Sequence, residues 1–249
     1  MRQFISRKLA NLSIRLGGPQ DLKAFIPELQ PWQHEMLRAV QPYTMTEPSA
    51  LWATLQALQH VHDRGIAGDF VECGVWRGGN TILAGLMRKR LGRDFAIHAF
   101  DTFAGMTAPT EFDAKPGKEL DVQAKFDSME QGDHNDWCYA SLEDVRNNFR
   151  TVVGNDDLKT IKGPVQDTLI VEANLPETIA VLRLDTDFYD STKIELEALW
   201  PRLAVGGVMM IDDYGVWAGA RKAVDEFFEG RSIWLHRVDR QVRLVVKLD

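Results

Sequence analysis

The sequence predicts an α/β protein with a doubly wound sheet and one reversed strand near the C-terminus. Short apolar runs alternate with segments of helical periodicity along most of the chain, which is typical of parallel strands joined by helices. The last two strand-like runs, 233–238 and 241–248, are separated only by Asp239-Arg240. Such a short link predicts an antiparallel pair, and therefore one strand that runs against the others.

The first strand is expected at 70–75, followed by a glycine turn and then a helix that begins near Thr81. Gly74, Gly78 and Gly79 would let a ligand approach the backbone, and the helix N-terminus would offer free N–H groups. Their spacing matches neither the dinucleotide nor the nucleotide-triphosphate fingerprint. The alternative is that these glycines only pack the helix against the sheet.

An acid follows the second expected strand, 95–100. Asp101 lies 27 residues after Gly74, where a doubly wound fold binds the hydroxyls of a ribose. A helix cap or a solvated loop acid is the alternative. We favour the ribose because the glycine turn and the acid occur together in this order.

The other elements are expected as follows. Strands are predicted at 158–163, 179–184 and 208–211, and helices at 32–40, 48–61, 141–149, 193–203 and 218–228. Thr46 is the expected N-cap of the second helix, Asp187, Asp190 and Ser191 serve the start of the fourth, and Gly206-Gly207 ends it. The aperiodic stretch 104–139 is predicted to be a lid or substrate-binding insert, with Phe112 and Trp137 as apolar contacts.

Two strands end in acids that should meet at one edge of the sheet. Asp185 follows the strand 179–184, and Asp212 and Asp213 follow 208–211. Three carboxylates in a partly desolvated cleft repel each other unless a cation lies between them. Oxygen ligands favour a hard ion, Mg²⁺ first, with Mn²⁺ or Ca²⁺ as alternatives. The plainer alternative is that Asp212 caps the turn that follows.

Composition excludes several classes of function. The formal net charge of -7 argues against nucleic-acid binding, and no apolar run is long enough to span a membrane. Two cysteines, Cys73 and Cys138, form no disulfide framework and favour a reduced, cytoplasmic setting. The amphipathic segment 1–16 is expected to dock on its own domain or on a dimer mate rather than on a membrane, and we expect a homo-oligomer.

Four segments together resemble the macrocin O-methyltransferase family: FVECGVWRGG (70–79), FDTFAGM (100–106), LRLDTDFYDST (182–192) and GVMMIDDY (207–214). The resemblance spans about 43–228. It implies a seven-stranded, Rossmann-like methyltransferase fold that uses S-adenosylmethionine and Mg²⁺. Residues 1–42 match no family motif and are expected to form an N-terminal helical extension of a methyltransferase domain at 43–249.

The resemblance also implies residue roles. Glu72 and Gly74 would line the methionine part of the cofactor, and Asp101 would hold its ribose. Asp185, Asp212 and Asp213 would bind the metal, with Asp185 as a candidate catalytic base. The full set of expected cofactor-binding residues is Thr44, Met45, Glu72, Gly74, Val75, Trp76, Arg77, Gly78, Asp101, Thr102, Phe103, Ser141 and Asp185.

The expected activity is transfer of the methyl group of S-adenosylmethionine to one hydroxyl of a metal-chelated vicinal diol, on a sugar of a natural product or glycoside. A catechol-type aromatic diol would chelate a metal in the same way, so it stays as an alternative acceptor. A non-catalytic nucleotide-binding or partner-binding α/β protein with solvated acids is the alternative from another class.

Overall fold

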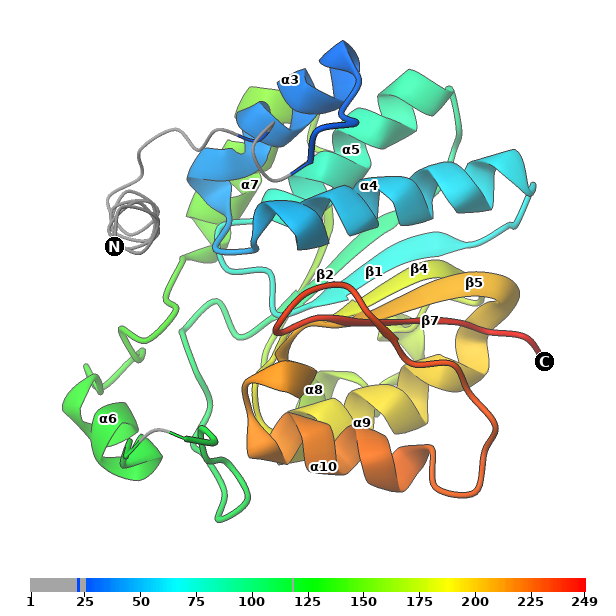
Figure 1. The fold of residues 1–249 in the computed structure, drawn as a ribbon. Helices are drawn as coiled ribbons and strands as arrows, with labels where there is room; N and C mark the ends of the chain where they lie inside the picture. The colour runs from blue at the N-terminus through cyan, green and yellow to red at the C-terminus, as the bar shows by residue number, and fades with distance from the viewer. Residues whose placement is uncertain (1–21, 23–25, 118) are drawn as a thin grey trace, which may run out of the picture.

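The computed structural model describes residues 22, 26–117 and 119–249 (Figure 1). The amphipathic segment expected at 1–16 lies outside these residues, and the homo-oligomer stays a prediction. Within the described ranges, no helix is both long enough and apolar enough to cross a membrane.

The described residues form one seven-stranded sheet in the order β3-β2-β1-β4-β5-β7-β6. Strands β1 to β5 run parallel, and β7 is antiparallel to both of its neighbours. The predicted α/β class, with a reversed strand near the C-terminus, is therefore confirmed. The strands are Asp69–Cys73 (β1), Ile97–Asp101 (β2), Lys159–Lys162 (β3), Ile179–Leu184 (β4), Leu203–Ile211 (β5), His236–Arg237 (β6) and Arg243–Val246 (β7).

Helices cover both faces of the sheet (Figure 1). One layer contains α3 (Pro31–Val40), α4 (Pro48–Asp63), α5 (Gly79–Leu91) and α7 (Leu142–Val153), and the other contains α8 (Val165–Thr168), α9 (Tyr189–Leu199) and α10 (Ala218–Phe227). The short helix α6 (Val122–Ser128) lies apart from both layers, in the segment between β2 and α7. Single 3₁₀ turns occur at Gln41–Tyr43, Glu172–Asn174, Trp200–Arg202 and Asp213–Gly215.

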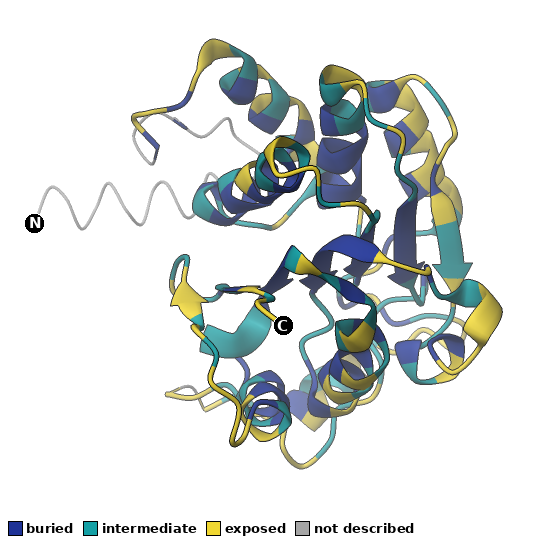
Figure 2. Cartoon of the chain, turned by 90° about the vertical axis from the view of Figure 1, so that its right-hand side faces the viewer, coloured by how far each residue is buried: buried dark blue, intermediate teal, exposed yellow. Residues whose placement is uncertain are grey.

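Successive residues of each central strand face opposite layers, which divides the core into two apolar clusters. Val208 and Met210 of β5 pack with α3, α4, α5 and α7, while Met209 and Ile211 pack with the α9 and α10 side. Figure 2 shows the result as buried strands between helices whose outer faces are exposed. The same alternation decides which polar side chains meet at the strand ends.

Several expected boundaries were wrong. Helix α9 begins at Tyr189 rather than at 193, and Gly206-Gly207 lies inside β5 instead of ending a helix. Glu47 occupies the N-cap position of α4 in place of Thr46. Helices α6 and α8 were not expected, because both are too short to show a helical period.

The segment 104–139 packs against the N-terminal ends of α9 and α10. Asp113, buried in this segment, accepts a hydrogen bond from Tyr189 N at 2.8 Å, and Ala218 N donates to Ala114 O at 2.9 Å. Trp137 packs edge-on against Phe188 and at a tilt against Trp217. These contacts hold the segment over one end of the sheet, and its role as a lid or substrate-binding insert stays a prediction.

Helices α5 and α7 pack closely at Gly85 of α5. A Cβ at this position would lie 2.8 Å from Val153 Cγ2 and 3.0 Å from the Phe149 ring. Helix propensity alone predicts that Gly85→Ala stabilises the protein by about 1 kcal/mol. We expect the clash to dominate, with a net loss of about 1–2 kcal/mol in the free energy of unfolding, measured by urea denaturation. A more stable Gly85→Ala variant would contradict this packing.

Candidate active site

A cavity of about 350 Å³ lies at the carboxyl ends of β1, β2, β4 and β5, which is where ligands of open α/β sheets bind. Its inner wall is formed by the glycine turn after β1 and by the loops after β2, β4 and β5. The lid segment supplies the other wall, and the residues that line it from there include Gly105, Met106, Thr107, Lys115, Trp137 and Cys138.

A buried guanidinium lies beneath the cavity floor. Arg183 of β4 is fully buried and pairs in register with Glu72 of β1. Its Nε donates to Glu72 Oε1 at 3.0 Å, and its Nη2 donates to Asp185 Oδ2 at 2.7 Å and to Asp212 Oδ2. Alternate residues of neighbouring strands face the same side of the sheet, which brings these side chains together. Glu72, Arg183 and Asp212 all point to the side of α4 and α5.

Burial and the neighbouring acids set the charges of this network. Burial alone lowers the Arg183 pKa, but Asp212, Asp185 and Glu72 outweigh it and raise the pKa, so the guanidinium stays charged. Burial raises the pKa of Glu72 to about 7, although Arg183 acts to lower it. Burial also raises the pKa of Asp212 to about 7, again with Arg183 opposing the shift. One cation thus offsets only part of the acidic charge collected here.

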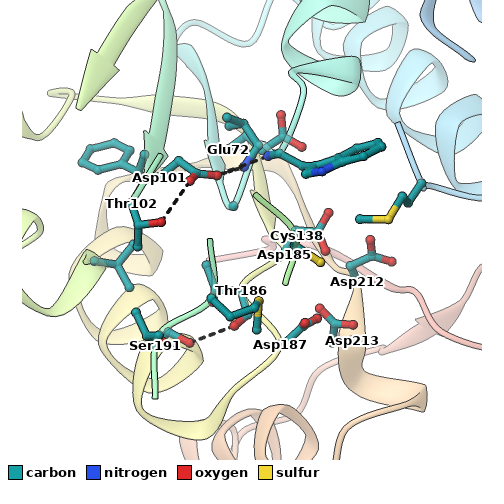
Figure 3. Close-up of a pocket in the computed structure, with 18 of the residues that line it drawn as sticks. Glu72, Asp101, Thr102, Cys138, Asp185, Thr186, Asp187, Ser191, Asp212 and Asp213 are labelled. Atoms are coloured by element: carbon teal, nitrogen blue, oxygen red, sulfur yellow. Dashed lines mark hydrogen bonds between the residues drawn. The ribbon is translucent and has the colours of Figure 1, made fainter. Parts of the chain in front are cut away.

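Asp185 also belongs to a second group of carboxylates, which lines the cavity (Figure 3). Oxygen atoms of Asp185, Asp187 and Asp213 all lie within 4.8 Å of one another. The structure thus joins Asp185 and Asp213, two of the three expected metal ligands, with Asp187. The expectation that Asp187 serves the start of α9 was wrong, because Phe188 occupies the N-cap position and Asp187 lines the cavity.

These acids fit the donor set of a hard divalent cation. Burial, followed by Asp187, Asp185 and Asp212, raises the pKa of Asp213 well above its usual range. Among the described residues, neither Asp213 Oδ2 nor Asp212 Oδ1 has a hydrogen-bond partner, and both atoms are buried. A buried carboxylate oxygen without a partner is costly, and a cation between these side chains would satisfy it. Asp212 therefore still offers one oxygen to the cavity while the other binds Arg183.

Asp101 joins the loop after β1 to the loop after β2. Its Oδ2 accepts hydrogen bonds from Val75 N at 2.7 Å and Trp76 N at 3.2 Å, and its Oδ1 accepts from Phe103 N at 2.7 Å. Burial raises its pKa, and these three N–H groups lower it. The carboxylate lines the cavity across from the acidic cluster (Figure 3). Oδ2 already accepts two hydrogen bonds, so Oδ1 is the oxygen with an acceptor site left for a ribose hydroxyl, since Thr102 Oγ1, 3.4 Å from it, donates at 2.6 Å to Gly105 O.

The backbone is strained where the cavity is formed. Among the described residues, the non-glycine positions with positive φ are Trp76, Phe103, Cys138 and Asp187. Three of them line the cavity, and Phe103 follows Thr102, which also lines it. Gly74, with φ +79°, is required in the same place, because a Cβ there would lie 2.0 Å from the carbonyl oxygen of Asp185. Such clustering is typical of functional sites.

The structure brings together most of the residues expected to bind the cofactor. Those that line the cavity are Thr44, Met45, Glu72, Gly74, Val75, Trp76, Asp101, Thr102 and Asp185. Four others lie outside the cavity lining: Gly78 is the N-cap of α5, Ser141 caps α7, Phe103 is buried, and Arg77 is exposed with its Nη1 donating to Pro42 O. Their part in cofactor binding stays a prediction.

Several residues of the site were not expected from the sequence. Asn80 is buried on the cavity wall, where its Oδ1 accepts from Thr54 Oγ1 at 3.0 Å and its Nδ2 donates to Thr46 Oγ1 at 3.2 Å. Lys115 and Trp217 also line the cavity, with Lys115 Nζ 4.1 Å from the Trp217 ring centroid. For Arg183 a signal was available: a charged residue in an apolar strand, on the same face as Glu72 of the neighbouring strand.

Comparisons with known proteins agree with this geometry. The family model of macrocin O-methyltransferases matches residues 33–242, so the match begins within α3, ahead of the expected start near residue 43. Demethyldecarbamoylnovobiocin O-methyltransferase of Streptomyces niveus is 34% identical over 187 residues, which cover 74% of this chain and 67% of that relative. The solved structure of the O-methyltransferase NovP superimposes with a TM-score of 0.71 at 27% identity, covering 96% of this chain and 100% of that one.

The name of a second relative includes the compound that it methylates. The 8-demethyl-8-(2,3-dimethoxy-alpha-L-rhamnosyl)-tetracenomycin-C 4'-O-methyltransferase of Streptomyces olivaceus is 36% identical over 165 residues, which cover 66% of this chain and 59% of that relative. The fold and the cavity, taken with these matches, define an O-methyltransferase with a Rossmann-like sheet. The chain belongs to the macrocin O-methyltransferase family.

The pair of Glu72 and Arg183 generates a pH prediction. Because the pKa of Glu72 rises from 4.5 to about 7 on folding, the folded state holds more protons than the unfolded state between these values. The contribution of Glu72 to stability is then full below pH 4.5 and lost as the pH rises through 7. We expect the stability of the wild type relative to Glu72→Gln to fall by roughly 3 kcal/mol between pH 4.5 and 8.

Urea denaturation of both proteins in EDTA at several pH values measures this difference. Glu72→Gln keeps the side-chain volume and an acceptor for Arg183 Nε, so it isolates the titration. Parallel stability curves for the two proteins would show that Glu72 does not titrate in this range.

Proposed function

We propose that this protein methylates a hydroxyl of a vicinal diol on a sugar of a natural product or glycoside, with S-adenosylmethionine as the donor and a divalent cation, Mg²⁺ first and Mn²⁺ as the alternative, holding the diol. The observation that carries the proposal is the position of the carboxylate cluster, which shares one cavity with the glycine turn after β1. The rhamnosyl group in the name of one relative supports a sugar as the acceptor.

The donor would lie along the inner wall of the cavity. Gly74 leaves room for it beside the backbone, Glu72 Oε2 is buried without a hydrogen-bond partner in the described part of the chain, and Asp101 lies where a ribose would bind. An amino group of the donor would satisfy the free Glu72 oxygen. S-adenosylmethionine supplies a methyl group that is already activated as a sulfonium, so the chain's task is to position the acceptor oxygen in line with it.

The acceptor would lie between the acidic cluster and the lid. Asp185 and Asp213 would hold the cation, together with Asp212 through Oδ1 and with Asp187 beside them. A bound cation lowers the proton affinity of a chelated hydroxyl, as it does for water. Trp137 and Trp217 contribute apolar surface on the acceptor side and exclude water from it.

A carboxylate must accept the hydroxyl proton. We assign this role to Asp185, whose Oδ2 is held by Arg183 Nη2 and whose side chain is 26% exposed toward the cavity. Arg183 fixes the orientation of the carboxylate and uses one of its lone pairs, so Asp185 could hold the cation through another lone pair and accept the proton on a third.

The metal part of the proposal is tested with Asp213→Asn. This change removes one anionic ligand and leaves the side-chain volume, so we expect Mg²⁺-dependent methyl transfer to fall at least about 100-fold. Asp190→Asn is the matched control, since Asp190 is exposed on the first turn of α9 and should keep its activity within about twofold. Calorimetry with S-adenosylhomocysteine should show unchanged binding in both variants.

Methyl transfer is measured on a panel of glycosides and aromatic diols, with Mg²⁺ present or chelated. Methyl transfer to catechols but not to glycosides would show that the acceptor is an aromatic diol rather than a sugar. Absence of S-adenosylhomocysteine binding by the wild type at high micromolar concentration would refute the donor, and full activity of Asp213→Asn would remove the metal from the proposal.

A further inference from the structure

Glu195 is a buried acid to which the proposed reaction gives no role. It lies on α9 with 0% of its surface exposed. Its Oε1 accepts a hydrogen bond from Thr186 Oγ1 at 2.9 Å, and within the described residues its Oε2 has no hydrogen-bond partner. Acidic side chains are almost never fully buried unless they are paired or hydrogen-bonded, because burial of the group is costly.

Thr186 connects Glu195 to the acidic cluster. It lies between Asp185 and Asp187 in the loop that leads from β4 to α9, and all three residues line the cavity. Figure 3 shows Thr186 beside these acids, with the hydrogen bond of 3.2 Å from Ser191 Oγ to its carbonyl oxygen. Glu195, on α9, therefore holds the side chain of Thr186. Ser191, on the same helix, shares its hydroxyl proton between the backbone carbonyl oxygens of Thr186 and of Phe188, the latter at 3.0 Å.

The loop 185–188 needs supporting contacts to keep its backbone conformation. Asp187 has a φ of +67°, in the left-handed region that L side chains rarely adopt. Backbone in this region persists only where the surrounding contacts determine it. The contacts include Asp185 N to Cys73 O at 2.9 Å, Phe188 N to Thr186 O at 2.8 Å, the hydrogen bond from Arg183 Nη2 to Asp185 Oδ2, and the two bonds from α9.

The charge of Glu195 agrees with a role in support of the cluster. Burial raises the pKa of Glu195 well above its usual range, and the nearby Asp185 raises it further, against opposing effects from Thr186 and Cys73. This shift favours the neutral form of the carboxyl group. In that form it can hold Thr186 without adding another negative charge behind acids that already repel one another.

We propose that Glu195 is a positioning residue, which acts through Thr186 to hold the loop 185–188 so that the carboxylates of Asp185 and Asp187 face the cavity. This role rests on the proposed function, because it is the methyl-transfer site that needs these carboxylates in place. A buried acid that only fills the core is the alternative.

Three variants separate the two roles. Glu195→Gln keeps a neutral acceptor for Thr186 in nearly the same volume, whereas Glu195→Leu keeps the volume and removes the acceptor. Thr186→Val removes the donor of the same hydrogen bond, and it tests the proposal even if Glu195→Leu does not fold. Glu197→Gln is the control, since Glu197 is exposed on the same helix. Each protein is examined by hydrogen exchange of the peptide covering 185–188, by Mn²⁺ binding measured with electron paramagnetic resonance, by S-adenosylhomocysteine calorimetry, and by kcat and KM.

We expect Glu195→Leu and Thr186→Val to speed exchange at 185–188 and to weaken Mn²⁺ binding and kcat by about tenfold or more, as loss of a supporting contact does at metal sites. Glu195→Gln and Glu197→Gln should stay within about twofold of the wild type. S-adenosylhomocysteine affinity should stay within about twofold in all four variants. The double variant Glu195→Leu with Thr186→Val should be no worse than either single variant, because both remove the same bond.

The inference is overturned if exchange at 185–188 is unchanged in Glu195→Leu and Thr186→Val, whatever the activity. It is also overturned if exchange speeds up while Mn²⁺ binding and kcat stay at wild-type values, since Glu195 would then only support the fold. Failure of the proposed function looks different, because the wild type itself would bind neither Mn²⁺ nor S-adenosylhomocysteine.

Discussion

The guanidinium of Arg183 is the interaction on which the site depends. The carboxyl ends of β1, β4 and β5 bring Glu72, Asp185 and Asp212 to one place, and Arg183 donates to all three. Without this cation, the acids would have to take up protons or move apart. A buried ion network of this kind contributes little to stability compared with an apolar core of equal volume. We therefore interpret it as a feature that the site requires rather than one that the fold requires.

Arg183 also determines which carboxylate oxygens face the cavity. It takes one oxygen each from Glu72, Asp185 and Asp212, and it leaves Asp187 and Asp213 to face the cavity with the remaining oxygens. The second oxygens of Asp185 and Asp212 lie with Asp187 and Asp213 in a group of carboxylates that one divalent cation would bridge. Trp137 of the segment 104–139 and Trp217 at the N-cap of α10 line the cavity beside these acids.

Much of this could be predicted from the sequence. The order of strands and helices follows from apolar periodicity, and the family motifs lead to the acids at the strand ends. Asp187 was assigned to a helix start because a sequence does not show that the loop before α9 turns through a left-handed residue. The boundaries of α9 and β5 were missed because tertiary packing outweighed the local signals of Gly206-Gly207. The lid anchors are contacts between distant segments, and no local pattern encodes them.

The central claim is that the acids in front of Arg183 hold a hard dication beside the methyl donor. Crystals grown with Mn²⁺ and S-adenosylhomocysteine, with data collected at the manganese absorption edge, test it most directly. The account predicts one anomalous peak bound by Asp185 and Asp213, in the same cavity as the donor's sulfur, with Arg183 still paired to Glu72. An empty cluster beside well-ordered S-adenosylhomocysteine, or manganese bound elsewhere on the chain, would contradict it.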